Sequence, residues 1–345
     1  MNLNVRTLRD ISWKINEPEY RAYEALSQSM IGKFDKGGFK EVPNLNKPIS
    51  SPSITFGKAV DTLITGDKKD FDKQFVVLDI EKPSESITAI VDYLFENYKD
   101  TFTTMNSMPT ELLDNVATQF NYYNNRSADS KAKLLKEKGG AYYMALCSTK
   151  GKEVLTIEQY QKVVATVNTL KSHPIISPLI NNLPFQNPAI ERFFQLKFRG
   201  KIDGIEYKVM LDLIVVDHEK KIISLYDLKT TSKPEYEFYK SFIEWRYNLQ
   251  AELYTKIVEE NIKKDPCYKG YKVEGFTFIV INPNSLNPLL WKTDPYTTKT
   301  IKDHPLRSVF DLGKELYKYL TTPSEVPEGI SLNTINNIDE WIEKI

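Results

Sequence analysis

Two apolar runs, each interrupted by one aspartate, limit what this chain can fold into more than any other feature. Residues 207–217 (YKVMLDLIVVD) and 221–231 (KIISLYDLKTT) are rich in large apolar side chains, and the polar stretch DHEKK lies between the apolar parts. This pattern predicts two antiparallel strands joined by a short turn. If the turn is centred on Glu219 and Lys220, residue 217 pairs with 222 and Asp212 lies opposite Asp227.

This register brings three charged side chains to one face of the hairpin. Directly opposed residues have Cβ atoms about 5 Å apart, and Asp227 and Lys229, two apart on one strand, share a face. A three-residue loop without a bulge would instead turn Asp212 to the other face. An exposed Asp227–Lys229 ion pair is the ordinary alternative. It would satisfy only one of two carboxylates that such apolar runs should nearly bury.

Two opposed carboxylates repel each other unless a cation lies between them. Mg²⁺ prefers oxygen ligands and is typically held by one or two carboxylates together with water and substrate phosphate. A nearby lysine can position or deprotonate the attacking water and stabilise the charge that develops on phosphorus. The pattern of Asp212, Asp227 and Lys229 therefore predicts a Mg²⁺ or Mn²⁺ site suited to phosphodiester hydrolysis.

The rest of the chain predicts an α/β (α+β) fold with a mixed central sheet flanked by helices. Further strands are expected from Ile190 and from Phe276, and a long helical stretch from about Tyr236 to Lys263. We expect a single domain over 1–345, with a mostly helical region at about 83–175 and a sheet core at about 188–285. Shorter helices are expected near 18–34, 55–65 and 306–320 and close to Ile338.

Composition excludes several other classes of protein. Lys+Arg and Asp+Glu are equal at 46 each, so the chain lacks the basic excess usual in nucleic-acid binders, although a local basic face can coexist with an acidic remainder. Two cysteines, Cys147 and Cys267, cannot supply a four-cysteine zinc or iron–sulfur site. The first residues lack the apolar core of a signal peptide, and no run is long enough to span a membrane. We therefore expect a soluble, cytoplasmic protein without a membrane partner.

Several segments resemble one nuclease family in composition and order. An acidic residue, a hairpin and then D-L-K is similar to the signature of the PD-(D/E)XK nuclease superfamily. Four further segments resemble motifs of its phage-type exonuclease VIII (RecE-like) or RecB-like exonuclease branch: the S-x-S helix, the G-x-A-x-H-x-L segment, the helix before the sheet and the Q-x-x-x-Y helix. They read ALSQSMIGKF, ITFGKAVDTLITGDKKDFDKQFVV, GKEVLTIEQYQKVVATVNTLKSHP and IEWRYNLQAELYTKIVEE. The likeness runs from about residue 26 to 282.

The resemblance implies a PD-(D/E)XK core that hydrolyses DNA with a metal ion, most readily as an exonuclease in phage-type recombination or replication. It implies that Asp212, Asp227 and the backbone carbonyl of Leu228 ligate the metal and that Lys229 assists the water. Gln250 would lie at the rim of the site and orient the lysine or the nucleic acid. An ordinary amphipathic helix explains the spacing of Gln250 equally well.

Asp61 departs from the family pattern, which commonly has a histidine at this position. Gly57 and Asp61 share a helical face, and the small Gly57 would let that face approach the sheet, so that Asp61 supplies an oxygen ligand. The other interpretation is a solvated helix residue beside a decayed site. Glu191 is a candidate for a second metal position, although a solvated glutamate on an edge strand is commoner.

Candidates for DNA contact are Lys58, Arg246 and Tyr254, since phosphate contacts need Lys and Arg, although clustered charges are more often a solvated face. Two other functions stay open: a decayed module that binds DNA or a protein partner, and a structure-specific endonuclease. The resemblance also allows a single-strand annealing or recombination protein as partner, a homo-oligomer, and a bacterial host cytoplasm if the chain is phage-encoded. The sequence leaves polarity and strand preference open.

Overall fold

The computed structural model describes residues 6–47, 51–79, 83–149, 151–181, 187 and 189–321. The chain divides into two compact units, each with its own apolar core. The sheet unit comprises Met1–Gly57 and Asn168–Ile345, and the helical unit comprises Lys58–Val167. The helix expected near Ile338 lies outside the described residues. The single domain that we expected is thus organised as two units, with boundaries inside helices α4 (Pro52–Thr65) and α9 (Ile157–Ser172).

A five-stranded mixed sheet forms the centre of the sheet unit, in the order β3-β4-β5-β6-β7. Strands β3, β4 and β5 pair antiparallel, β5 and β6 pair parallel, and β6 and β7 pair antiparallel. The predicted mixed sheet flanked by helices is confirmed. The strands are β3 (Ile190–Ile202), β4 (Ile205–Asp217), β5 (Ile222–Thr230), β6 (Lys272–Ile281) and β7 (Pro288–Thr293).

Local turns set the register of the first three strands. Asp203 and Gly204 both have positive φ, 49° and 84°, which is typical of an Asp-Gly hairpin turn. At the next turn Asp217 pairs with Ile222, as predicted. The Asp217 carboxylate accepts a hydrogen bond from the backbone N–H of Lys220 at 2.9 Å and so closes this turn.

The connection from β5 to β6 carries the helix that covers one face of the sheet. A parallel pair needs such a crossover, and here it contains α11 (Phe238–Glu244) and α12 (Tyr247–Ile262). We expected one helical stretch, but Arg246 has a left-handed backbone with φ 56° and breaks it. The Arg246 guanidinium forms an ion pair with the buried side chain of Asp35, which lies far away in the sequence. A distant contact therefore decides where α12 begins.

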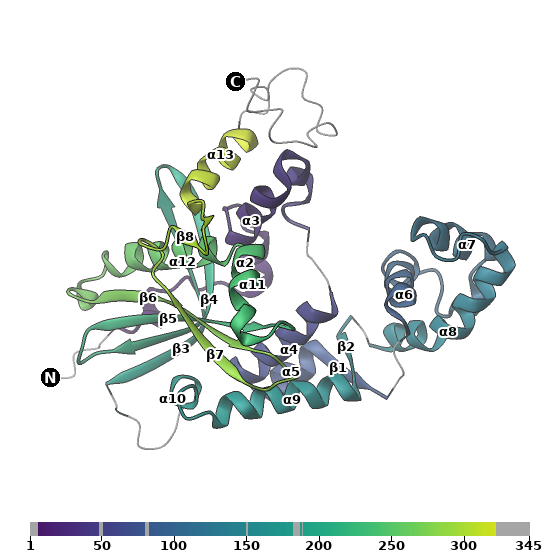
Figure 1. The fold of residues 1–345 in the computed structure, drawn as a ribbon, viewed down its shortest axis with the longest axis horizontal. Coiled ribbons are helices and arrows are strands. Elements are labelled where there is room, and N and C mark those ends of the chain that lie inside the picture. The colour runs from purple at the N-terminus through teal and green to yellow at the C-terminus, as the bar shows by residue number, and fades with distance from the viewer. Residues whose placement is uncertain are drawn as a thin grey trace. The chain divides into compact units, whose positions relative to one another are not determined.

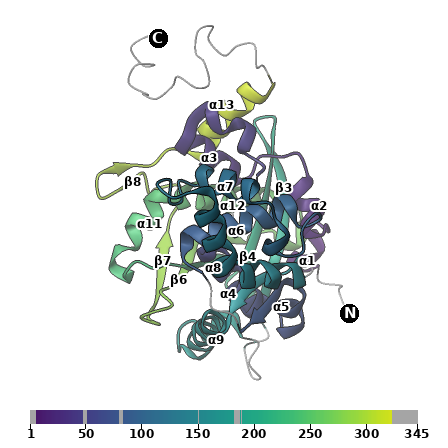
Figure 2. The same ribbon diagram turned by 90° about the vertical axis from the view of Figure 1, so that its right-hand side faces the viewer.

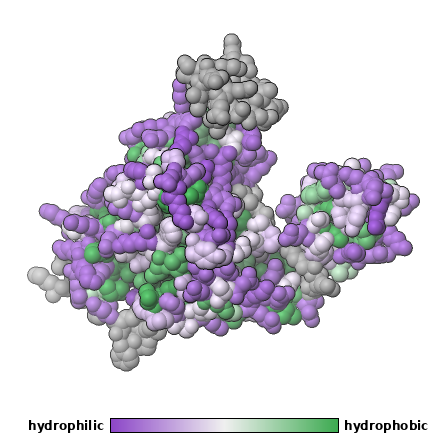
Figure 3. Space-filling view, viewed as in Figure 1, coloured by the Kyte–Doolittle hydropathy of each residue, from purple (hydrophilic) through white to green (hydrophobic). Residues whose placement is uncertain are grey.

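Helix α12 contacts β3, β4 and β6 on one side and two further helices on the other. These are α3 (Gln28–Gly37) and α13 (Val309–Thr321), which lie side by side in both ribbon views (Figures 1 and 2). The N-terminal segment is bound to β4 through the buried Lys208. Its ammonium donates hydrogen bonds to the carbonyls of Tyr20, Arg21 and Tyr23. Hydrophilic residues cover most of the face drawn in Figure 3.

Short elements complete the sheet unit. They are α1 (Leu8–Ile11), α2 (Glu17–Ala22), η1 (Gly38–Asn44), α10 (Ser177–Ile180), η3 (Glu235–Glu237), η4 (Pro266–Tyr268), β8 (Thr300–Ile301) and β9 (His304–Pro305). The residues near 18–34, which the sequence allowed to form one helix or two short ones, form the two helices α2 and α3.

The helical unit begins earlier than the expected boundary near residue 83. The reason is a parallel pair between β1 (Phe75–Leu78) and β2 (Glu153–Thr156), which ties the two ends of the unit together. The unit also contains α5 (Lys68–Gln74), α6 (Glu85–Tyr98), η2 (Met105–Ser107), α7 (Thr110–Gln119) and α8 (Ala128–Ser148). Helix α8 was not predicted, because Gly139 and Gly140 interrupt its pattern. A Cβ atom at Gly139 would come within 2.7 Å of Val91, so the glycine permits close packing on α6. Among the described helices, none has the length and apolar character needed to cross a bilayer.

Candidate active site

Asp212 lies where the pairing of β4 with β5 ends. The backbone pairs run from Asp217–Ile222 to Leu213–Tyr226, and one further step in this register places Asp212 opposite Asp227. The Asp212 carboxylate reaches across to β5, where its Oδ2 accepts a hydrogen bond from the Leu228 N–H at 3.0 Å. The predicted register is confirmed, and the side chain of Asp212 takes the place of a backbone acceptor.

The pairing of β3 with β4 is interrupted at the same residue. Among the described residues of these strands, Gln195 and Asp212 are the one opposed couple that is missing from an otherwise continuous series. Gln195 has a left-handed backbone with φ 54°. Its side-chain Nε2 donates to Oδ1 of Asp212 at 3.5 Å. The sheet is thus opened on both sides of Asp212.

Asp227 is buried between the sheet and α12. Its side chain is 4% exposed, and it forms an ion pair with Lys229 through Oδ2. Its Oδ1 accepts a hydrogen bond from Nε2 of Gln250. Gln250 is itself 5% exposed, because Leu249 and Leu253 bury its helix in the core of the sheet unit. Helix α12 therefore places the Gln250 amide on the Asp227 carboxylate, whereas the resemblance implied a glutamine that orients the lysine or the nucleic acid.

The charge of Lys229 is set by its acidic neighbours. Burial by itself lowers the pKa of Lys229, but Asp227, Tyr247 and Asp212 outweigh burial and raise the pKa above its ordinary range. Nζ also lies 4.9 Å from the ring centroid of Tyr247. Lys229 is therefore an ammonium at neutral pH in this arrangement. Because both aspartates contribute to this shift, the structure brings all three charged groups of the predicted patch together.

Tyr254, on α12, feels the charge of the same two aspartates. Burial raises the pKa of Tyr254 well above its ordinary value, and Tyr20, Asp227 and Asp212 add to the effect. Its ring packs edge-on against Phe276, with ring centroids 6.1 Å apart. Tyr254 is thus a neutral phenol packed against the apolar core.

The donor set fits a hard divalent cation. Asp212 and Asp227 offer carboxylate oxygens, each of which has capacity beyond one hydrogen bond. The backbone carbonyl of Leu228, the residue between Asp227 and Lys229, offers a further oxygen. In the described part of the chain, no group of three or more His, Cys, Asp or Glu side chains forms a metal site. Mg²⁺ commonly accepts one or two carboxylates and completes its shell with water and phosphate oxygens.

Glu191 does not join this group, which corrects our expectation of a second metal position. It lies four residues before Gln195 on β3, about 13 Å away along an extended strand. Its Oε2 contacts Nε2 of His218 at 2.9 Å, and Nδ1 of His218 contacts the Tyr271 hydroxyl at 2.8 Å. Glu191 therefore belongs to the far end of the β4–β5 hairpin.

The three candidates for DNA contact are engaged in contacts within the protein. Lys58 forms an ion pair with Glu153 at 2.7 Å inside the helical unit. Arg246 is bound to Asp35, which Arg307 also contacts at 3.2 Å. Tyr254 is packed as described above. The structure gives each of these side chains an intramolecular role, and their contact with DNA stays a prediction.

Gly57 behaves as the sequence predicted. A Cβ atom at this position would lie 3.2 Å from Oγ1 of Thr230, the residue after Lys229. The glycine thus lets α4 approach the end of β5 within the sheet unit. Asp61 is half-buried further along the same helix, in the part that belongs to the helical unit.

Sequence reasoning missed Gln195 and Tyr247 as neighbours of the site. The signal for Gln195 was present in the Asp203–Gly204 turn, because counting back from the Ile202–Ile205 pair places residue 195 opposite Asp212. No comparable signal existed for Tyr247. Its position depends on the helix break at Arg246.

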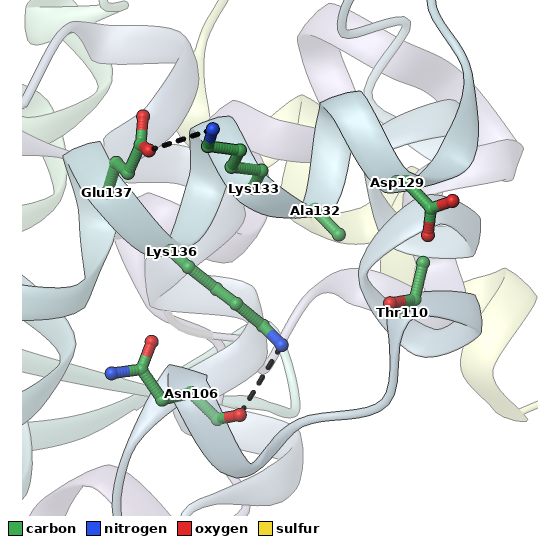
Figure 4. Close-up of a pocket in the computed structure, with 7 residues that line it drawn as sticks. All are labelled: Asn106, Thr110, Asp129, Ala132, Lys133, Lys136 and Glu137. Atoms are coloured by element: carbon green, nitrogen blue, oxygen red, sulfur yellow. Dashed lines mark hydrogen bonds and ion pairs between the residues drawn. The ribbon is translucent and has the colours of Figure 1, made fainter.

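One open depression of about 500 Å³ lies in the helical unit (Figure 4). Its lining is mixed in charge and internally paired. Lys136 donates to the Asn106 carbonyl at 3.3 Å, and Lys133 lies 3.9 Å from Glu137. None of the predicted site residues lines it, so it adds nothing to the aspartate–lysine group.

No protein-family model and no curated protein matches the chain. Solved structures that match it include the following two. The "Putative exonuclease" of Eubacterium rectale has 13% identity and a TM-score of 0.46, with coverage of 91% of this chain and 89% of that one. Protein VC1899 of Vibrio cholerae has 10% identity and a TM-score of 0.19, with coverage of 80% and 57%. Likenesses of this strength do not bear on what the chain does.

Proposed function

We propose that this protein is a metal-dependent nuclease that hydrolyses phosphodiester bonds of DNA, with Asp212, Asp227 and Lys229 as its catalytic residues. The observation that carries the proposal is the gathering of two carboxylates and one ammonium where the sheet opens at Asp212. A buried carboxylate beside a half-buried one serves no evident packing purpose, whereas the pair suits a divalent cation and a phosphate.

Each residue of the site has a definite part in this proposal. Asp212 and Asp227 would hold Mg²⁺ or Mn²⁺ together with the Leu228 carbonyl. When bound, the ion would polarise the phosphate and make a water molecule more acidic. The Lys229 ammonium would bind a phosphate oxygen and stabilise the developing negative charge. Gln250 keeps the Asp227 carboxylate oriented, because its amide holds one of the two oxygens.

Finer assignments rest on the sequence pattern alone. We propose an exonuclease of phage-type recombination or replication, with Asp61 as a further oxygen ligand in place of the family histidine. A single-strand annealing or recombination protein is the corresponding partner.

Replacing Lys229 by alanine tests the catalytic assignment. We expect the variant to lose activity about 10²- to 10³-fold, the usual effect of removing one group that stabilises transition-state charge. The measurement is degradation of end-labelled linear DNA and closed circular DNA by the purified protein with Mg²⁺, with EDTA as the metal-free control. Lys201→Ala, an exposed lysine on β3, is the matched control and should retain full activity.

The same assay separates the alternatives. Loss of linear DNA with intact circles indicates an exonuclease, and cleaved circles indicate an endonuclease. Unchanged activity of Lys229→Ala would contradict the catalytic assignment. A wild-type protein that binds DNA and leaves it intact would identify a decayed module and overturn the proposed function.

A further inference from the structure

We infer that Gln195 is a positioning residue that orients the Asp212 carboxylate for a divalent cation, and that its left-handed backbone places its amide there. The inference deepens the proposed function and rests on it. It concerns this chain's own residues and can be measured with the metal alone.

The backbone of Gln195 is unusual for its place in the fold. It has φ 54° inside the 13-residue strand β3, between residues that pair regularly with β4. Residues with a side chain rarely adopt this conformation outside turns, because Cβ crowds the backbone. Such strain persists where the surrounding structure enforces it, and it collects at functional sites.

This strain coincides with the opening of the sheet at Asp212. The couple Gln195–Asp212 is missing from the β3–β4 series, and the β4–β5 series ends one residue short of Asp212. The Asp212 carboxylate accepts instead from one donor on each side. Oδ1 faces the Gln195 amide at 3.5 Å, and Oδ2 faces the Leu228 N–H at 3.0 Å.

The group that Gln195 presents to Asp212 is a neutral amide. An amide orients a carboxylate without neutralising it, so the negative charge stays available for a cation. Gln250, on helix α12, orients the Asp227 carboxylate in the same way by donating to its Oδ1. Each aspartate is therefore held by one neutral glutamine amide, Gln195 from β3 and Gln250 from α12. A lysine or arginine in either place would have cancelled the charge that a metal needs.

The variant Gln195→Gly distinguishes a positioning role of Gln195 from a purely structural role. Gln195→Gly accepts a positive φ without strain and lacks the amide. If the residue only bends the strand, this variant equals the wild type or exceeds it in stability and in metal binding. If the residue positions Asp212, stability is kept while metal binding falls.

The experiment is titration of Mn²⁺ into the DNA-free protein, followed by calorimetry, with the melting temperature measured in EDTA. We expect Gln195→Gly to bind Mn²⁺ about 10- to 100-fold more weakly, the usual effect of removing a group that orients a ligand. Its melting temperature should equal or exceed that of the wild type. Lys221→Gly is the matched control, because Lys221 has φ 55° in the neighbouring hairpin turn. It should bind Mn²⁺ like the wild type.

Unchanged Mn²⁺ affinity of Gln195→Gly would overturn the inference, as would an equal loss in Lys221→Gly. A wild-type protein that binds Mn²⁺ but leaves DNA intact would sink the proposed function and leave the inference standing. A wild-type protein that binds no Mn²⁺ would overturn both.

Discussion

At the scale of single residues, the site is a balance of charges within a largely apolar sheet. Asp227 is nearly buried and pairs with Lys229, while Asp212 accepts hydrogen bonds from the Gln195 amide and the Leu228 N–H and also helps to raise the pKa of Lys229. The two carboxylates repel each other. This repulsion opposes folding in the absence of a cation and favours binding of one.

Replacing Asp212 by asparagine should separate these two effects. The amide oxygen of asparagine can still accept from the Leu228 N–H, so the geometry of the strand is kept. We expect the melting temperature in EDTA to stay equal or rise, because the repulsion with Asp227 is relieved. Affinity for Mg²⁺ should fall, because a charged ligand is lost. Calorimetric scans with and without Mg²⁺ measure both quantities. A clear loss of stability in EDTA would show that Asp212 serves the fold rather than the cation.

At the scale of elements, the β4–β5 hairpin carries the site, and its turn sets the register on which the site depends. The backbone N–H of Lys220 lowers the pKa of Asp217 below its ordinary value, and the Lys220 side chain adds to the effect. A carboxyl group with a lowered folded-state pKa stabilises the protein above its unfolded-state pKa. This contribution is lost as the pH falls through the folded-state value.

The variant Asp217→Asn should therefore be less stable than the wild type at pH 7. The difference should shrink as the pH falls below about 4, the ordinary pKa of an aspartate. Urea unfolding of both proteins at pH 7 and near pH 3 measures it. Glu219→Gln, in the same exposed loop, is the control and should show no comparable change. A difference that does not vary with pH would mean that the charge of Asp217 is unimportant for the turn.

At the scale of the whole molecule, the described residues form two apolar cores that share no residues. One core belongs to the sheet unit and the other, around Leu94 and Tyr143, belongs to the helical unit. Separate cores of this kind usually unfold as separate cooperative steps. The tryptophans of the described residues, Trp13, Trp245 and Trp291, all lie in the sheet unit, and 58–167 contains no tryptophan, so tryptophan fluorescence does not follow the helical unit.

Calorimetry should therefore resolve two transitions, of which tryptophan fluorescence follows only one. Mg²⁺ should raise the melting temperature of the transition seen by fluorescence, because Asp212 and Asp227 lie in the sheet unit. Saturation to 100 times the dissociation constant stabilises the binding unit by about 2.7 kcal/mol. The Asp212→Asn variant should lose this shift. A single transition followed equally by both probes would contradict the division into two units.

Local pattern was enough to determine the central strands, their hairpin register and the carboxylate pair. Strands β4 and β5 are neighbours in sequence, so the turn between them and the alternation of their side chains decide which residues face each other. Helical pattern similarly predicted α4 and α13, and the mostly helical character of the region that contains α6, α7 and α9. These elements depend on contacts within a few residues, and such contacts leave a readable trace in the sequence.

Tertiary structure decided the features that depend on residues far apart in the chain. The start of α12 depends on an ion pair between Arg246 and Asp35, and the extent of the helical unit depends on the pairing of β1 with β2. The left-handed conformation of Gln195 lies between residues that pair with β4, and the Glu191 carboxylate contacts His218 at the far end of the hairpin. No local periodicity or propensity in the sequence predicts these contacts. Their energy arises only when separate segments meet, and for that reason the sequence by itself determined the carboxylate pair but not the conformation of Gln195 or the position of Tyr247 beside it.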